Sequence, residues 1–282
     1  MPLVNLSNIL DQAQQGNYAV GAFNVYNIED ITAVIQAAHQ ARSPVILMTS
    51  GSALEHTTVE DLAAIVGHRA REAEVPVCLH LDHAYDYDTI IKAMYAGYTS
   101  VMFDGSRLSY EENAGITSEV VKVAHPLGIS VEAEIGRVGK SEEGDEDFES
   151  VLSVPEEVKR FVEDTGIDAC AIAIGTQHGM QTQAAELDFE RLERIRDLVD
   201  VPLVLHGSSG VKDKELQVMG EKGIQKVNIG TRLKRVFTDT LRQTLDEDKQ
   251  LHNHIKALEP SIDAVAGEVV HKMEMLGCKG QA

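Results

Sequence analysis

Residues 169–174 read ACAIAI, an unbroken apolar run that leads into the polar stretch GTQHG at 175–179. Such a run is typical of a parallel strand covered by helices, whereas a half-exposed antiparallel strand alternates apolar and polar residues. Short runs of this kind recur and predict eight strands, at Tyr18–Asn24, Pro44–Met48, Val77–Leu81, Ser100–Phe103, Ser130–Glu134, Asp168–Ile174, Pro202–Leu205 and Lys226–Ile229.

The segments between these strands carry apolar residues at helical spacing, for example at Ile31, Val34, Ile35 and Ala38. Regular alternation of strand and helix indicates βαβ units, and eight of them predict a (β/α)8 TIM barrel, with a doubly wound open sheet as the alternative. After the last strand we expect a helix at Thr231–Asp246, a polar bend at Asp246–Asn253 and an extra C-terminal helix at Ile262–Leu276. We expect residues 1–282 to form a single (β/α)8 barrel domain.

The chain is acidic, with 25 Lys and Arg against 45 Asp and Glu and a net charge of −20. This balance argues against binding to nucleic acid or to an anionic membrane surface. No apolar run approaches the length of a membrane span, and no basic segment precedes an apolar stretch at the N-terminus, so we expect no signal peptide. The 3 cysteines lie outside any CxxC pair, which fits a reducing compartment. We predict a cytoplasmic protein.

One segment is far more acidic than the rest of the chain. Residues 142–149 read EEGDEDFE, and an acidic run of this kind is most simply a solvated surface loop.

Three histidines follow predicted strands: His83 lies in LHLDHA, His178 in GTQHG and His206 in LHGSSG. In a barrel, the carboxyl ends of the strands share one rim, which is where the active site lies. Three neutral imidazoles with an open fourth position make a catalytic zinc site. Each histidine alone would more simply be a packed or surface residue, but their common placement favours the metal site. His80 shares a strand face with Asp82, and we expect it to be structural.

Asp82 precedes one of these histidines and could act as a general acid or base beside the metal, or it could cap the next helix. Two small-residue loops, GSSG at 207–210 and NIGT at 228–231, follow the last two strands. Loops at these positions form the usual phosphate site of a barrel, because backbone N–H groups and hydroxyls can approach the oxygens closely. We therefore predict that these loops bind substrate, with Ser208, Ile229 and Gly230 among the contacts.

The chain resembles the class II, metal-dependent ketose-bisphosphate aldolases, the family of fructose- and tagatose-bisphosphate aldolases. The resemblance covers nearly the whole chain, from residues 22–24 to 277–280. The motifs that carry it together are LHLDHA, SVMFDGS at 100–106, VEAEIG at 131–136, GTQHG and LHGSSG.

The resemblance implies that His83, His178 and His206 bind Zn²⁺ and that Asp82 exchanges the proton of the C4 oxygen. Asp104 and Glu134 match metal contacts that are indirect or alternative in the family. Glu142 matches an acid on a mobile loop that handles the C3 proton. Asn24 and Ser50 match residues that contact the substrate in the family. The residues that match its 1-phosphate site are Gly179, Gly207, Ser209, Asn228 and Thr231.

The implied reaction is the reversible cleavage of a ketose 1,6-bisphosphate to dihydroxyacetone phosphate and an aldehyde, through a zinc-stabilised enediolate. Such an enzyme is a lyase of glycolysis or related carbohydrate metabolism. The sequence does not distinguish fructose from tagatose substrates, which differ only at C4. The family's usual oligomers imply a homodimer or homotetramer. No lysine follows a strand where a Schiff base would need it.

Three departures from the family pattern concern the distal end of the substrate. Arg232 stands where many members carry an acid, and Lys140-Ser141 stands where glycine is common. Residues 251–256 read LHNHIK where close relatives carry Asp-Pro-Arg. The alternatives are therefore a ketose 1-phosphate without a 6-phosphate, or a sugar-phosphate-binding barrel without turnover. Arg232, Lys234 and Arg235 could supply other anion contacts.

Overall fold

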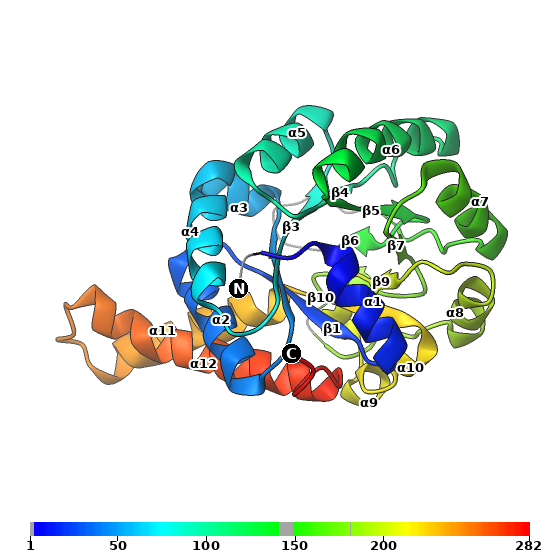
Figure 1. Cartoon of the computed structure of the whole chain (residues 1–282). Coiled ribbons are helices and arrows are strands. Elements are labelled where there is room, and N and C mark those ends of the chain that lie inside the picture. Colours follow the sequence, from blue (N-terminus) through cyan, green and yellow to red (C-terminus); the bar gives the residue numbers. More distant parts are fainter. Residues whose placement is uncertain (1–2, 141–148, 181) are drawn as a thin grey trace.

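The computed structural model describes residues 3–140, 149–180 and 182–282. It contains a closed barrel of eight parallel strands in the order β1-β10-β9-β7-β5-β4-β3-β2, so the predicted barrel is confirmed. Figure 1 shows the strands at the centre with the helices around them. The barrel strands are β1 (Val20–Asn24), β2 (Val45–Thr49), β3 (Val77–Ala84), β4 (Ser100–Phe103), β5 (Ser130–Ile135), β7 (Ala169–Ile172), β9 (Leu203–Leu205) and β10 (Ile224–Ile229).

Helices connect consecutive strands and cover the barrel from outside. They bury one apolar face each, as in α2, where Ile31, Val34 and Ala38 are fully buried. The helices between and after the strands are α2 (Ile28–Ala41), α3 (Gly51–His56), α4 (Val59–Glu72), α5 (Tyr87–Ala96), α6 (Tyr110–Ala124), α7 (Pro155–Thr165), α8 (Phe189–Arg196), α9 (Asp213–Leu216), α10 (Met219–Lys222), α11 (Thr231–Glu247) and α12 (His254–Met275).

One further helix, α1 (Leu6–Gly16), precedes the first strand. It contacts β1, β3, β5 and β10 at their starts, where the Ser7 hydroxyl lies 2.8 Å from the hydroxyl of Ser130. The helix therefore closes the amino-terminal end of the barrel and leaves the carboxyl ends of the strands as the open rim.

The C-terminal helix is longer than its sequence pattern predicts. Our expected start at Ile262 is wrong, because α12 begins at His254, where Asn253 caps it by accepting hydrogen bonds from the N–H groups of Ile255 and Lys256. Pro260 lies inside the helix and removes one backbone donor, but packing against α2 and α11 holds the helix together. In Figure 1 the far ends of α11 and α12 project away from the barrel as a hairpin.

Within the described ranges, the helices are all too short or too polar to cross a lipid bilayer.

Candidate active site

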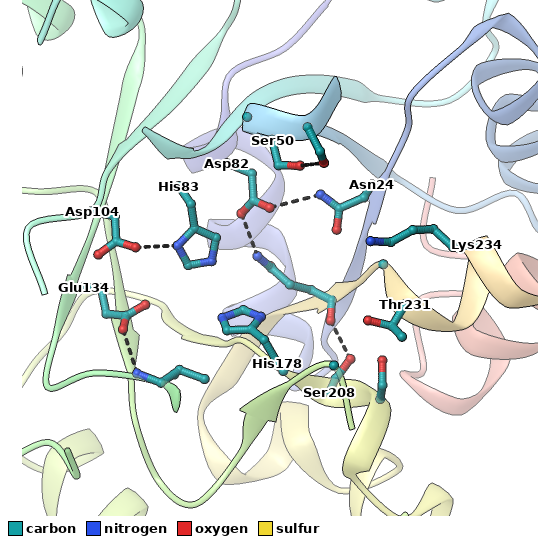
Figure 2. A pocket seen from close by; sticks show the side chains of 18 of the residues that line it. Asn24, Ser50, Asp82, His83, Asp104, Glu134, His178, Ser208, Thr231 and Lys234 are labelled. Carbon is teal, nitrogen blue, oxygen red and sulfur yellow. Dashed lines mark hydrogen bonds and ion pairs between the residues drawn. The ribbon is translucent and has the colours of Figure 1, made fainter. Parts of the chain in front are cut away.

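A cavity of about 400 Å³ opens at the carboxyl ends of the barrel strands. Polar and charged side chains from several strands and loops line it, as Figure 2 shows. Of the residues predicted from sequence, the lining includes Asn24, Ser50, Asp82, His83, Asp104, Glu134, His178, Gly179, Gly207, Ser208, Ser209, Asn228, Gly230 and Thr231.

The end of β3 delivers two adjacent residues to this cavity. Neighbouring residues of a regular strand point to opposite faces, so Asp82 and His83 would normally diverge. His83 instead has a φ of +49°, in the left-handed region, and the pairing of β3 with β4 shifts register between Leu81 and Ala84. Holding a non-glycine residue there costs of order 1–3 kcal/mol, a kind of strain that clusters at functional sites. The local turn lets both side chains face the same space.

Three imidazoles meet beside the cavity: His83 and His178 line it, whereas His206 is fully buried next to them. His83, His178 and His206 each offer a ring nitrogen, and these atoms all lie within 4.8 Å of one another. Nε2 of His83 and Nδ1 of His206 lie 2.8 Å apart. Nitrogen donors so arranged can hold a transition metal ion such as zinc.

A second group of possible ligands shares His83. Its Nδ1 atom lies 2.6 Å from the Asp104 carboxylate, and Glu134 completes a cluster whose ligand atoms lie within 4.8 Å. Oε1 of Glu134 accepts a hydrogen bond from the N–H of Val138, whereas its buried Oε2 has no hydrogen-bond partner among the described residues. A buried carboxylate oxygen without a donor fits a nearby cation.

Charges in this cluster shift the acidity of its members. Burial lowers the pKa of His83, but the neighbouring carboxylates of Asp82 and Asp104 outweigh this effect and raise it to about 10. Burial and the adjacent Asp104 raise the pKa of Glu134 to about 8. Without a metal ion, these shifts favour the charged form of His83 and the protonated form of Glu134 at neutral pH.

Asp82 is held by two amides rather than by a helix. The side-chain N–H groups of Asn24 and Asn228 donate to its two oxygens at 3.0 and 3.1 Å. The next helix, α5, is capped by Asp86, so Asp82 is not its N-cap. Burial works to raise the pKa of Asp82, but the charges of His83, His206 and Lys226 hold it below its usual range. The carboxylate is ionised and oriented, as a proton acceptor must be.

The two predicted phosphate loops lie side by side. The hydroxyl of Ser208 donates to the backbone carbonyl of Asn228 at 2.5 Å, which ties the loop after β9 to the end of β10. Gly207 has a φ of +65°, and a Cβ atom there would lie 2.7 Å from the backbone of Gln177. The glycine therefore permits this close approach. The side chain of Ile229 does not line the cavity; it is buried and borders a second cavity behind the loop.

Comparison with known proteins identifies the family. The sequence profile described as "Fructose-bisphosphate aldolase class-II" matches residues 4–281. This chain belongs to the class II fructose-bisphosphate aldolase family. Membership indicates a lyase.

Solved structures of similar chains agree with this assignment. The YdjI aldolase from Escherichia coli K12 is 34% identical, with 99% of both chains covered and a TM-score of 0.86. A protein from Coccidioides immitis assigned as a fructose-1,6-bisphosphate aldolase is 34% identical, with 98% of this chain and 97% of the other covered and a TM-score of 0.88. The fructose-bisphosphate aldolase of Campylobacter jejuni, at 23% identity over 100% of this chain and 97% of its own, shares the fold with a TM-score of 0.86.

One predicted residue of this class II aldolase, Glu142, lies outside the described residues. The chain reaches that stretch through β6 (Gly139–Lys140), which pairs in parallel with β8 (Gln177–His178). In this pairing, the backbone of Lys140 is the register partner of His178.

Two functional candidates were missed in the sequence. Glu132 and Lys226 are fully buried inside the barrel, directly beneath the histidines. The Glu132 carboxylate lies 3.0 Å from Nε2 of His206 and 2.8 Å from the Lys226 ammonium. The sequence spacing could have identified them. Each lies two residues before a predicted site residue, Glu134 or Asn228, and alternate residues of a strand share a face.

Proposed function

We propose that this member of the aldolase family is zinc-dependent and reversibly cleaves a ketose 1,6-bisphosphate of fructose or tagatose type to dihydroxyacetone phosphate and an aldehyde. The observation that carries the proposal is the meeting of three imidazole nitrogens beside an ionised, doubly hydrogen-bonded Asp82, next to two small-residue loops.

The residues present fit a zinc ion. His83, His178 and His206 would hold it, and Asp104 and Glu134 form a second or alternative position that shares His83. A bound zinc ion supplies a Lewis acid that polarises a ketone carbonyl and stabilises the negative charge that develops during cleavage.

Two carboxylates would move the protons. Asp82 would take the proton of the C4 hydroxyl as the C3–C4 bond breaks, while Asn24 and Asn228 fix its orientation. Glu142 would return a proton to C3. It follows Lys140 by two residues, and two residues of extended chain span about 7 Å. Since Lys140 pairs with His178, this distance is compatible with the assigned role.

The loops at 207–210 and 228–231 would bind the 1-phosphate. Gly179, Gly207 and Gly230 leave the backbone accessible, and the start of α11 at Thr231 favours an anion through the helix dipole. Hydroxyls of Ser208, Ser209 and Thr231 lie at the same wall. Such a local site offsets the repulsion that an anionic substrate meets from a chain of net charge −20.

The positive charges along this cavity bear on the choice of substrate. Among its described lining residues Lys234 is the one lysine or arginine, and its ammonium lies 5.4 Å from the centre of the Tyr26 ring. Arg232 and Arg235 instead line the second cavity, where Arg232 forms an ion pair with Glu268 at 3.0 Å. Because a single described cation lines the cavity, a ketose 1-phosphate without a 6-phosphate is the second candidate substrate. Ser50 lines the same cavity, and Figure 2 shows it near Asp82.

Hydrogen exchange on dihydroxyacetone phosphate tests the donor half without knowledge of the aldehyde. The zinc-loaded protein is mixed with this compound in deuterated water, and exchange at the hydroxymethyl carbon is followed by NMR with and without a chelator. We expect exchange that the chelator abolishes. No exchange in a verified zinc-loaded sample would leave a barrel that binds sugar phosphates without turnover. Where exchange is observed, addition of glyceraldehyde with or without a 3-phosphate would separate the two candidate substrates.

We also propose a homodimer or homotetramer in the cytoplasm. The hairpin of α11 and α12 supports the assembly: Leu233 is the one buried residue of α11, and Leu245 and Ile255 are 41% and 61% exposed. Light scattering on the purified protein measures the oligomeric state.

A further inference from the structure

A charged cluster lies inside the barrel, below the cavity and outside its lining. Glu132 on β5 and Lys226 on β10 are both 0% exposed, and the ammonium lies 2.8 and 3.1 Å from the two carboxylate oxygens. Nε2 of His80 lies 3.8 Å from the same carboxylate, and Nδ1 of His80 pairs with the Ser100 hydroxyl at 2.8 Å. Neither Glu132 nor Lys226 lines the cavity, so neither can touch a substrate there.

Stability does not explain this pair. Moving two charges out of water costs several kcal/mol for each ion, and replacing a buried pair by apolar residues of similar volume is often neutral or stabilising. The barrel interior offers such residues readily, since its neighbours on β7 are alanine, cysteine and isoleucine. A role in the function of the site would account for retaining the pair.

The contact that points to such a role is the one with His206. Oε1 of Glu132 lies 3.0 Å from Nε2 of His206, while Nδ1 of the same ring faces His83 at 2.8 Å. A carboxylate accepts hydrogen bonds and does not donate them, so Nε2 of His206 carries the proton and Nδ1 presents its lone pair toward the other histidines.

We propose that Glu132 is a positioning residue that fixes the tautomer and ring orientation of His206 for metal binding, and that Lys226 holds the Glu132 carboxylate in place and ionised. The inference rests on the metal site of the proposed function. A carboxylate that accepts the second N–H of a ligand histidine makes that histidine a better ligand, and its loss costs about 10- to 100-fold in metal affinity.

The test compares two double variants that both remove the buried charges. In Glu132→Leu/Lys226→Met, His206 loses its acceptor. In Glu132→Gln/Lys226→Met, the amide oxygen can still accept the hydrogen bond from Nε2. As a matched control, Thr49→Val/Tyr98→Phe removes a buried 2.8 Å hydrogen bond of the barrel wall that does not contact the histidines. Zinc affinity is measured by competition with a chromogenic chelator, and thermal unfolding of each metal-free variant reports its folding.

We expect the leucine variant to remain folded and to bind zinc 10- to 100-fold more weakly than wild type, the glutamine variant to recover most of that affinity, and the control to match wild type. Visible spectra of the cobalt-substituted proteins should change in the leucine variant alone. A folded leucine variant with wild-type zinc affinity would overturn the proposal, and so would equal losses in the leucine and glutamine variants.

A direct measurement covers the case in which the variants fail to fold. In metal-free wild type labelled with ¹⁵N-histidine, the His206 signals, assigned by their loss in His206→Ala, should show a protonated Nε2 and an unprotonated Nδ1. The opposite tautomer refutes the inference. Failure of the proposed function is distinguishable, because it would appear in the wild type as absence of zinc binding or of exchange on dihydroxyacetone phosphate.

Discussion

Nε2 of His83 and Nδ1 of His206 face each other at 2.8 Å, a distance at which two ring nitrogens share one proton. The other nitrogen of His83 lies 2.6 Å from Asp104, and the pKa of His83 is raised to about 10. In the metal-free protein at neutral pH, His83 is thus a cation whose Nε2 proton occupies the space between two proposed ligands. A metal ion needs the lone pairs of both nitrogens, so it must displace this proton.

Zinc binding should therefore release about one proton from His83 at pH 7. Because the pKa of the metal-free group lies near 10, each rise of one pH unit between 6 and 8 should increase the apparent zinc affinity about tenfold. Calorimetry in buffers of different ionisation enthalpy counts the protons. A binding enthalpy that does not depend on the buffer would contradict the assignment of His83 as a protonated ligand.

Asp82→Ala should separate metal binding from proton transfer. The Asp82 carboxylate is bonded to two asparagines and belongs to neither cluster of ligand atoms, so zinc content should stay at the wild-type level. Cleavage should fall by about 10²–10⁴-fold, the usual contribution of a positioned general base. Unchanged turnover with full zinc occupancy would contradict the role given to Asp82.

His206→Ala should lose metal and activity together. The residue supplies one of the three nitrogens of the proposed zinc site, and its removal also leaves the buried Glu132 carboxylate without one of its donors. Metal analysis after dialysis, together with the cleavage rate, measures both effects. If the variant retained a full complement of zinc, His206 could not be a required ligand.

The eight strands were predictable because each is a short apolar segment that is buried on all sides in a covered parallel barrel. The ends of the strands were less predictable. The strand β7 stops at Ile172, before the two apolar residues that continue its pattern, whereas β3 extends to Ala84. The start of α12 was missed because Pro260 argues against a helix interior, whereas a cap at Asn253 and tertiary packing decide the outcome.

The three histidines and Asp82 could be predicted as strand-end residues, but their convergence depends on backbone geometry that composition does not encode. The positive φ of His83 breaks the alternation rule on which a strand prediction relies. Glu132 and Lys226 escaped notice because a buried charge pair contradicts the expectation of an apolar barrel interior. Only the fold shows that the two lie 2.8 Å apart.

Gly207→Ala should weaken binding of the donor phosphate. Its φ of +65° disfavours any side chain, and the new Cβ would lie 2.7 Å from the backbone of Gln177, beside His178. We expect a loss of about 1–3 kcal/mol in unfolding free energy and at least a tenfold rise in the KM for dihydroxyacetone phosphate exchange.

Gly115→Ala is the matched control for this substitution. Gly115 lies within α6, and a Cβ atom there meets nothing within 4 Å. Alanine should stabilise the helix by about 0.5–1 kcal/mol and leave exchange unchanged. Equal KM values for the two variants would show that the loop at Gly207 does not contact the phosphate.

Lys234→Met should act on the acceptor end of the substrate and spare the donor end. Lys234 is the cation on the cavity wall beside Tyr26, and a charge-assisted hydrogen bond to an anion contributes about 1.5–3 kcal/mol. With a phosphorylated aldehyde, kcat/KM for condensation should fall about 10- to 100-fold, while exchange on dihydroxyacetone phosphate should stay near wild type. Arg232→Met, which breaks the ion pair with Glu268 in the second cavity, is the control and should change neither rate. Loss of exchange in Lys234→Met would instead place the lysine at the 1-phosphate. An unchanged rate with the phosphorylated aldehyde would favour a ketose 1-phosphate as the substrate.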